Sequence, residues 1–96
     1  MSAFFIAASL IKDPEKFQKY AKETGKILAA HGGELVLRGK FEGTLNGSAD
    51  HQVVGIIKFP SVEALHAWHD SEAYQALVPL RNEAADMTIS VYSIPA

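Results

Sequence analysis

The strongest constraint on the fold comes from two segments, residues 3–11 and 52–59, which are apolar at nearly every position. Their length and bulky side chains are typical of β-strands, and the lack of polar alternation indicates burial on both faces. Two further strands are expected at 34–41 and 87–94, where side chains of different character alternate. The turn signal Asn46-Gly47 predicts an exposed hairpin loop over residues 42–51.

Helix signals lie between these strands. Asp13 can accept backbone N–H bonds and Pro14 has its φ angle preset, so a helix is expected to begin there. Apolar residues at helical spacing continue this helix to Gly32-Gly33, where glycine releases the chain. Ser61 predicts the start of a second helix, and short helical turns are expected after it.

The order strand, helix, strand, strand, helix, strand predicts an α+β fold of the ferredoxin-like βαββαβ class. A four-stranded antiparallel sheet with the helices on one face would form a single domain over residues 1–96. Helices cover only one face of such a sheet, yet 3–11 and 52–59 are apolar on both. We therefore expect a homodimer through the open sheet face, which is the sheet-to-sheet arrangement of a dimeric α+β barrel.

Charge and cysteine content exclude several classes of function. The formal net charge of -2 argues against nucleic acid as a partner, because phosphate binding needs a basic patch. The absence of cysteine excludes disulfides and thiolate catalysis. The apolar N-terminal run stops at Lys12, before it is long enough to span a bilayer. These features favour a soluble cytoplasmic protein without a membrane partner.

A set of residues spread over almost the whole chain resembles the pattern of the "domain of unknown function 1330" family. Its most specific part is the Phe-Pro-Ser…Trp…Ser…Tyr…Arg series. The set consists of Asp13-Pro14, Tyr20, Gly32-Gly33, Arg38-Gly39, Glu42-Gly43, Phe59-Pro60-Ser61, Trp68, Ser71, Tyr74 and Arg81.

The resemblance implies the dimeric α+β barrel fold, whose relatives include cofactor-free monooxygenases, isomerases and stress-responsive proteins. It implies no catalytic residue, since the family has no established chemistry. Two positions depart from the family pattern: Lys40 stands where a second glycine is frequent, and Lys58 where an acidic residue is frequent. The second departure weighs against any role for a carboxylate at that position.

The candidate ligand pocket combines aromatic residues with cationic ones. A guanidinium such as that of Arg38 keeps its charge, so it needs either a carboxylate partner such as Glu34 or Glu42, or an anionic ligand. Trp68 fits the hydrophobic core as well as a pocket wall. Histidine titrates near neutral pH, which makes His31 and His69 candidate catalytic bases beside Arg38. The predicted pocket residues are Tyr20, Arg38, Trp68, His69, Tyr74 and Arg81.

No metal site or cofactor is predicted. Glu63, His66 and His69 follow one another at three-residue intervals, but no further ligand has the spacing of a metal motif. Phosphate-binding glycine loops are also missing from the sequence.

Two functions remain open at this point. The first is a small-molecule-binding dimer, which the fold relatives allow to be a cofactor-independent enzyme acting on a small polar or carboxylate-bearing compound. The alternative is a non-catalytic interaction protein, in which the same residues only complete the core and the interface.

Overall fold

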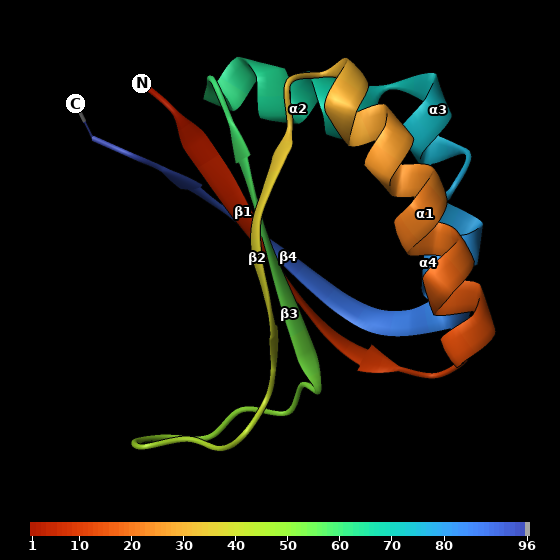
Figure 1. Cartoon of the computed structure of the whole chain (residues 1–96), viewed down its shortest axis with the longest axis vertical. Helices are drawn as coiled ribbons and strands as arrows, with labels where there is room; N and C mark the ends of the chain where they lie inside the picture. Colours follow the sequence, from red (N-terminus) through yellow and green to blue (C-terminus); the bar gives the residue numbers. More distant parts are fainter. Residues whose placement is uncertain (96) are drawn as a thin grey trace.

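The computed structural model describes residues 1–95 and has the expected ferredoxin-like fold (Figure 1). One antiparallel sheet is covered on one side by all the helices. In chain order the elements are β1 (Ala3–Ile11), α1 (Pro14–Ala30), β2 (Glu34–Lys40), β3 (Val53–Phe59), α2 (Val62–Asp70), α3 (Glu72–Gln75), α4 (Val78–Ala84) and β4 (Ala85–Ser93).

The strand order is β2-β3-β1-β4, so the two apolar strands β1 and β3 occupy the centre. Ala7 of β1 lies between Gly55 of β3 and Ile89 of β4. Side chains of directly paired residues point to the same face. Odd-numbered residues of β1 therefore face the helices, and even-numbered ones form the outer face. The predicted antiparallel sheet is confirmed.

Strand β2 contains an irregularity that the sequence pattern did not predict. Strict alternation of side chains along residues 34–41 predicts that Leu35 and Arg38 point to opposite faces of the sheet. The pairing register shifts between Leu35 and Leu37, so that Leu35 pairs with Ile57 and Arg38 with Gly55. Because such a bulge adds one residue to one strand, Leu35 and Arg38 share the helix-side face. The predicted alternation was therefore wrong over this strand.

Side-chain hydrogen bonds cap the N-terminal ends of α1 and α2. Asp13 Oδ1 accepts from the Lys16 amide at 3.1 Å, and Ser61 Oγ accepts from the Ala64 amide at 3.0 Å. After α1, Gly32 adopts a φ of 79°, a conformation that favours glycine. A Cβ on the next residue, Gly33, would lie 3.0 Å from Phe59. This glycine pair therefore allows the chain that leaves α1 to pass close to Phe59 of β3.

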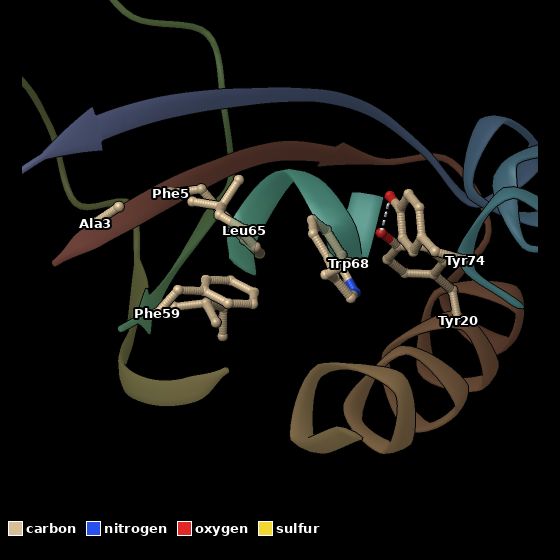
Figure 2. Close-up of a cluster of buried hydrophobic side chains, with 8 residues drawn as sticks. Ala3, Phe5, Tyr20, Phe59, Leu65, Trp68 and Tyr74 are labelled. Atoms are coloured by element: carbon tan, nitrogen blue, oxygen red, sulfur yellow. Dashed lines mark hydrogen bonds between the residues drawn. The ribbon is translucent and has the colours of Figure 1, made fainter. Parts of the chain in front are cut away.

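The hydrophobic core lies between α2, α3 and the inner face of β1 and β3 (Figure 2). Trp68 is its centre and is 1% exposed. Its ring stacks on Phe5 at a centroid distance of 4.9 Å and lies 4.3 Å from the ring of Tyr74. Phe59 packs against both Phe5 and Trp68, at 6.1 and 5.9 Å. This aromatic cluster anchors the helices to the sheet.

The outer sheet face is apolar and uncovered in the single chain. Leu37 is 50% exposed, and Tyr92, which is 46% exposed, stacks on Phe4 at 5.1 Å. Ile6 and Ile56 lie side by side between them. The predicted hairpin loop is confirmed: residues 41–52 form no regular structure and project away from the sheet (Figure 1).

Candidate functional site

A cavity of about 430 Å³ lies between α1 and the inner face of the sheet. Its volume falls within the range of small-molecule sites, roughly 300–1,000 Å³. Most of its wall is apolar. The lining residues are Phe5, Ala7, Ser9, Phe17, Gln18, Tyr20, Ala21, Thr24, Gly25, Leu28, Gly33, Leu35, Arg38, Gly39, Val53, Val54, Gly55, Ile57, Met87 and Ile89.

The cavity exists because the central strands carry small residues beneath α1. Gly55 and Ala7 are paired neighbours, and Ser9 follows on the same face of β1. A Cβ added to Gly55 would meet no atom within 4 Å. Elsewhere in β1 and β3 the inward positions hold large side chains such as Phe5 and Phe59. The floor of the cavity is therefore a stretch of the inner face on which the small residues Ala7, Ser9 and Gly55 are neighbours.

Arg38 contributes the positive charge of the cavity. It lies on the edge strand β2, its side chain is exposed, and the shifted register of β2 turns it toward the helix side. Within residues 1–95 it forms no ion pair, with Glu34, Glu42 or any other carboxylate. An arginine that lines an apolar cavity without a protein counter-ion is suited to receive an anionic group.

A hydrogen-bonded chain of side chains reaches the cavity from the opposite side. Arg81 Nη1 donates to Tyr74 Oη at 3.1 Å, and the hydroxyls of Tyr74 and Tyr20 are 2.8 Å apart (Figure 2). Burial raises the pKa of the Tyr20 hydroxyl well above its ordinary value, and the adjacent Tyr74 hydroxyl adds to the shift. Tyr20 therefore stays protonated at physiological pH.

The predicted pocket residues divide into two groups. Tyr20 and Arg38 line the cavity. Trp68 and Tyr74 are buried in the core behind it, and Arg81 touches the cavity only through the tyrosine pair. Tyr74 and Arg81 are seven positions apart in the sequence. Their side chains meet although Pro79 lies between them, because Pro79 falls in the first turn of α4.

The two candidate catalytic histidines lie outside the cavity wall. His31 Nδ1 is 3.0 Å from the Ile27 carbonyl at the end of α1. His69 Nδ1 is 3.0 Å from Asp70 Oδ1, and its ring lies against Trp68 and Tyr74. Tyr20 and Arg38 are thus the titratable side chains among the lining residues. They equip the cavity to bind and polarise a compound, whereas proton abstraction near neutral pH would need a group from elsewhere.

The residue types alone do not predict the cavity floor. The sequence predicts Ala7, Ser9 and Gly55 only as parts of apolar strands, and Thr24 only as part of the core-facing stripe of the first helix. A signal was available: within two strands of otherwise bulky residues, the small ones occur at positions that pair across the sheet.

A second hollow of similar volume, about 430 Å³, lies near the ends of β1 and β4. It is lined mainly by polar residues, among them Lys12, Asp50, His51 and Asp86. Lys12 Nζ is already 3.5 Å from Asp86 Oδ1, so its charge has a partner. Within residues 1–95 no group of three or more histidine, aspartate or glutamate side chains is arranged to hold a metal ion.

Comparison of the sequence with models of known families assigns the chain to a family. The model of the family described as "Domain of unknown function (DUF1330)" matches residues 2–93. The chain belongs to the DUF1330 family. The resemblance drawn from its sequence motifs is thereby confirmed. Among proteins with curated descriptions, none matches the chain.

Solved structures similar to this DUF1330 protein share its fold at low sequence identity. The RPA0582 protein of unknown function from Rhodopseudomonas palustris is 21% identical, with a TM-score of 0.82 over 99% of this chain and 83% of that one. SnoaB, a cofactor-independent oxygenase from Streptomyces nogalater, is 11% identical, with a TM-score of 0.72 over 99% and 94%.

A third similar structure is a dimeric ferredoxin-like protein of unknown function from Thermobifida fusca. It is 16% identical, with a TM-score of 0.64 over 98% of this chain and 92% of that one. At such identities these likenesses establish the ferredoxin-like fold alone. None of the helices within residues 1–95 has the length and apolar character that a membrane crossing requires.

Proposed function

We propose that this DUF1330 protein binds a small organic anion, with its apolar body between α1 and the sheet and its carboxylate on Arg38. The observation that carries the proposal is an arginine without an ion-pair partner in residues 1–95 on the wall of an otherwise apolar cavity. A guanidinium offers paired N–H groups whose geometry matches a carboxylate. The alkyl and aromatic walls would remove the body of the ligand from water.

We also propose that the protein works as a homodimer through its outer sheet face. Exposed apolar side chains, including Leu37 and Tyr92, cover that face. Apolar area of this kind on a sheet is typical of an interface between subunits. A protein with a similar fold is described as dimeric. The cavity lies on the other side of the sheet, so the dimer would leave one cavity per subunit on the helix side.

A second candidate, a cofactor-independent enzyme acting on the bound compound, is suggested by the fold shared with SnoaB. The protonated Tyr20 hydroxyl in the cavity favours it, because a fixed donor stabilises negative charge that develops on a substrate oxygen. Such an enzyme would act through orientation and hydrogen bonding. Incubating the protein with a bound compound and following its mass by chromatography would test for turnover; an unchanged compound leaves binding as the function.

The binding proposal is tested by titrating the protein with 2-naphthoate, a rigid apolar carboxylate. Arg38→Met should weaken binding by about ten- to a hundredfold, since a hydrogen bond to a charged group contributes roughly 1.5–3 kcal/mol. The melting temperature and the subunit mass should stay close to those of the unmodified protein. Lys40→Met is the matched control, because Lys40 is an exposed cation of the same strand that does not line the cavity.

Two results would overturn the proposal. If Arg38→Met and Lys40→Met weaken 2-naphthoate binding equally, the anion is held by general charge and not by Arg38. If Arg38→Met unfolds or dissociates, the arginine is structural.

A further inference from the structure

The Tyr20 hydroxyl has a proton whose acceptor within residues 1–95 is weak. Arg81 can only donate, so Tyr74 Oη accepts from it. A hydroxyl that accepts from a cation becomes a better donor, because hydrogen bonds in a chain polarise one another. The Tyr74 proton therefore points to Tyr20 Oη, 2.8 Å away. The Tyr20 proton must then point elsewhere.

The hydrogen-bond acceptor that the structure gives for that proton is a weak one. Met87 Sδ lies 3.9 Å from Tyr20 Oη, and a thioether sulfur is a weak acceptor. Both Tyr20 and Met87 line the cavity. A donor that is polarised by a cation through two hydrogen bonds and faces a cavity is prepared for an acceptor from a ligand.

The hydroxyl of Thr24 lies beside that of Tyr20. Thr24 follows Tyr20 by one helical turn, is 6% exposed and lines the cavity. Its Oγ1 is buried, lies close enough to the Tyr20 hydroxyl to lower the pKa of Tyr20, and has no well-aligned hydrogen-bond partner within residues 1–95. Buried hydroxyls normally have a partner, so two under-used hydroxyls on adjacent turns indicate a polar subsite.

We infer that Tyr20, supported by Thr24, binds a neutral hydrogen-bond acceptor of the ligand, such as a carbonyl oxygen, at the end of the cavity away from Arg38. Arg81 and Tyr74 act as positioning residues that orient and polarise the Tyr20 donor. The inference rests on the proposed function and refines it. The ligand class becomes a rigid apolar carboxylate with a carbonyl oxygen at its far end.

The topology sets the length of such a ligand. Arg38 lies on β2 and Met87 on β4, with β3 and β1 between them. Three strand spacings of roughly 4.8 Å separate the two strands by about 14 Å. Arg38 and Met87 are also offset along the strands, because Arg38 is in register with Ala7 of β1 and Met87 with Ser9. The arginine and methionine side chains extend into this span. Two fused rings with substituents at both ends are therefore a suitable probe, and a single small acid would reach only one of the two subsites.

The test compares 6-acetyl-2-naphthoate with 6-isopropenyl-2-naphthoate, in which a CH₂ group replaces the carbonyl oxygen. Both are titrated into the unmodified protein, Tyr20→Phe and Thr24→Val. The ratio of the two dissociation constants should favour the ketone in the unmodified protein. In Tyr20→Phe the ratio should fall by about tenfold, because the carbonyl loses its donor and is still removed from water. Thr24→Val should lower the ratio less.

Tyr74→Phe provides a second variant that keeps the Tyr20 hydroxyl and removes its polarisation. It should lower the ratio several-fold while leaving the affinity for the alkene unchanged. A role for Tyr74 in packing alone would instead change both affinities together.

The outcomes separate this inference from the proposed function. If both compounds bind with Arg38-dependent affinity and Tyr20→Phe leaves their ratio unchanged, the acceptor subsite is refuted and the anion site stands. If neither compound binds the unmodified protein, the proposed function itself fails. Should Tyr20→Phe not fold, an unfavourable ratio for the ketone in the unmodified protein would still refute the inference.

Discussion

Replacing Gly55 by leucine tests whether the space above the central strands is real and is used. Gly55 lies on the cavity floor between Arg38 and Ala7, and a Cβ there would meet no atom within 4 Å. Its φ is not positive, so a side chain imposes no backbone strain. A leucine would extend four carbon atoms into the space proposed for the ligand.

The expected effect on stability can be estimated from three contributions. Burial of each CH₂ group contributes roughly 0.8 kcal/mol, which gives about 3 kcal/mol as an upper limit because the cavity is open on one side. Removing a glycine from a strand adds roughly 0.5–1 kcal/mol. Ordering a leucine side chain costs roughly 0.5–1 kcal/mol. Gly55→Leu should therefore raise the free energy of unfolding by about 1–3 kcal/mol.

The same substitution should abolish binding of 2-naphthoate, because the leucine fills the space the rings would occupy. Guanidinium chloride unfolding measures the first effect and calorimetric titration the second, with Gly55→Ala as a control that fills little volume. A gain in stability with a loss of binding is the trade-off expected of a cavity kept open for a ligand. Gly55→Leu with undiminished affinity would refute the placement of the ligand, and a destabilised variant would refute the open space itself.

Three further predictions concern the core, the pH dependence and the outer face. Trp68→Ala should lower the free energy of unfolding by about 3–5 kcal/mol, measured by denaturant unfolding; a loss below 1 kcal/mol would contradict its central place in the core. Unfolded Tyr20 loses its proton near pH 10, whereas the buried hydroxyl retains it. Above that pH the unfolded state binds fewer protons, so stability should fall, by up to about 1.4 kcal/mol per pH unit from this group. The fall should be less steep in Tyr20→Phe, and equal slopes would contradict the raised pKa. Ile6→Glu should convert a dimer into a monomer in sedimentation analysis, and a dimer that survives would exclude the outer face as the interface.

Most of the fold could be predicted because its signals are local. Asp13 and Ser61 accept hydrogen bonds from backbone amides of α1 and α2, as their positions before each helix predicted. The apolar character of residues 3–11 and 52–59 predicted two buried strands, and in the structure these are the central strands β1 and β3. Such features depend on residues that are close together in the sequence, so they can be predicted without knowing the structure.

The site was less predictable because it depends on register. One shifted pair in β2 decides that Arg38 faces the cavity, and no residue type in that strand marks the shift. The cavity floor needs Gly55 beside Ala7, two positions that only the β1–β3 pairing brings together. Tyr20, Trp68 and Tyr74 were all predicted as pocket residues; Tyr20 lines the cavity, whereas the large rings of Trp68 and Tyr74 fill the core behind it.

The central claim, that the space between α1 and the sheet is a binding site, is tested most directly by mapping 2-naphthoate on the protein by amide NMR. The amide signals of glycines report on positions inside the cavity and outside it. Gly25, Gly39 and Gly55 line the cavity, whereas Gly43 and Gly47 lie in the hairpin loop outside it. Saturable shifts at the first three with unchanged signals from the loop pair would support the claim. Shifts confined to the loop pair, or no saturable shift at Gly55, would contradict it.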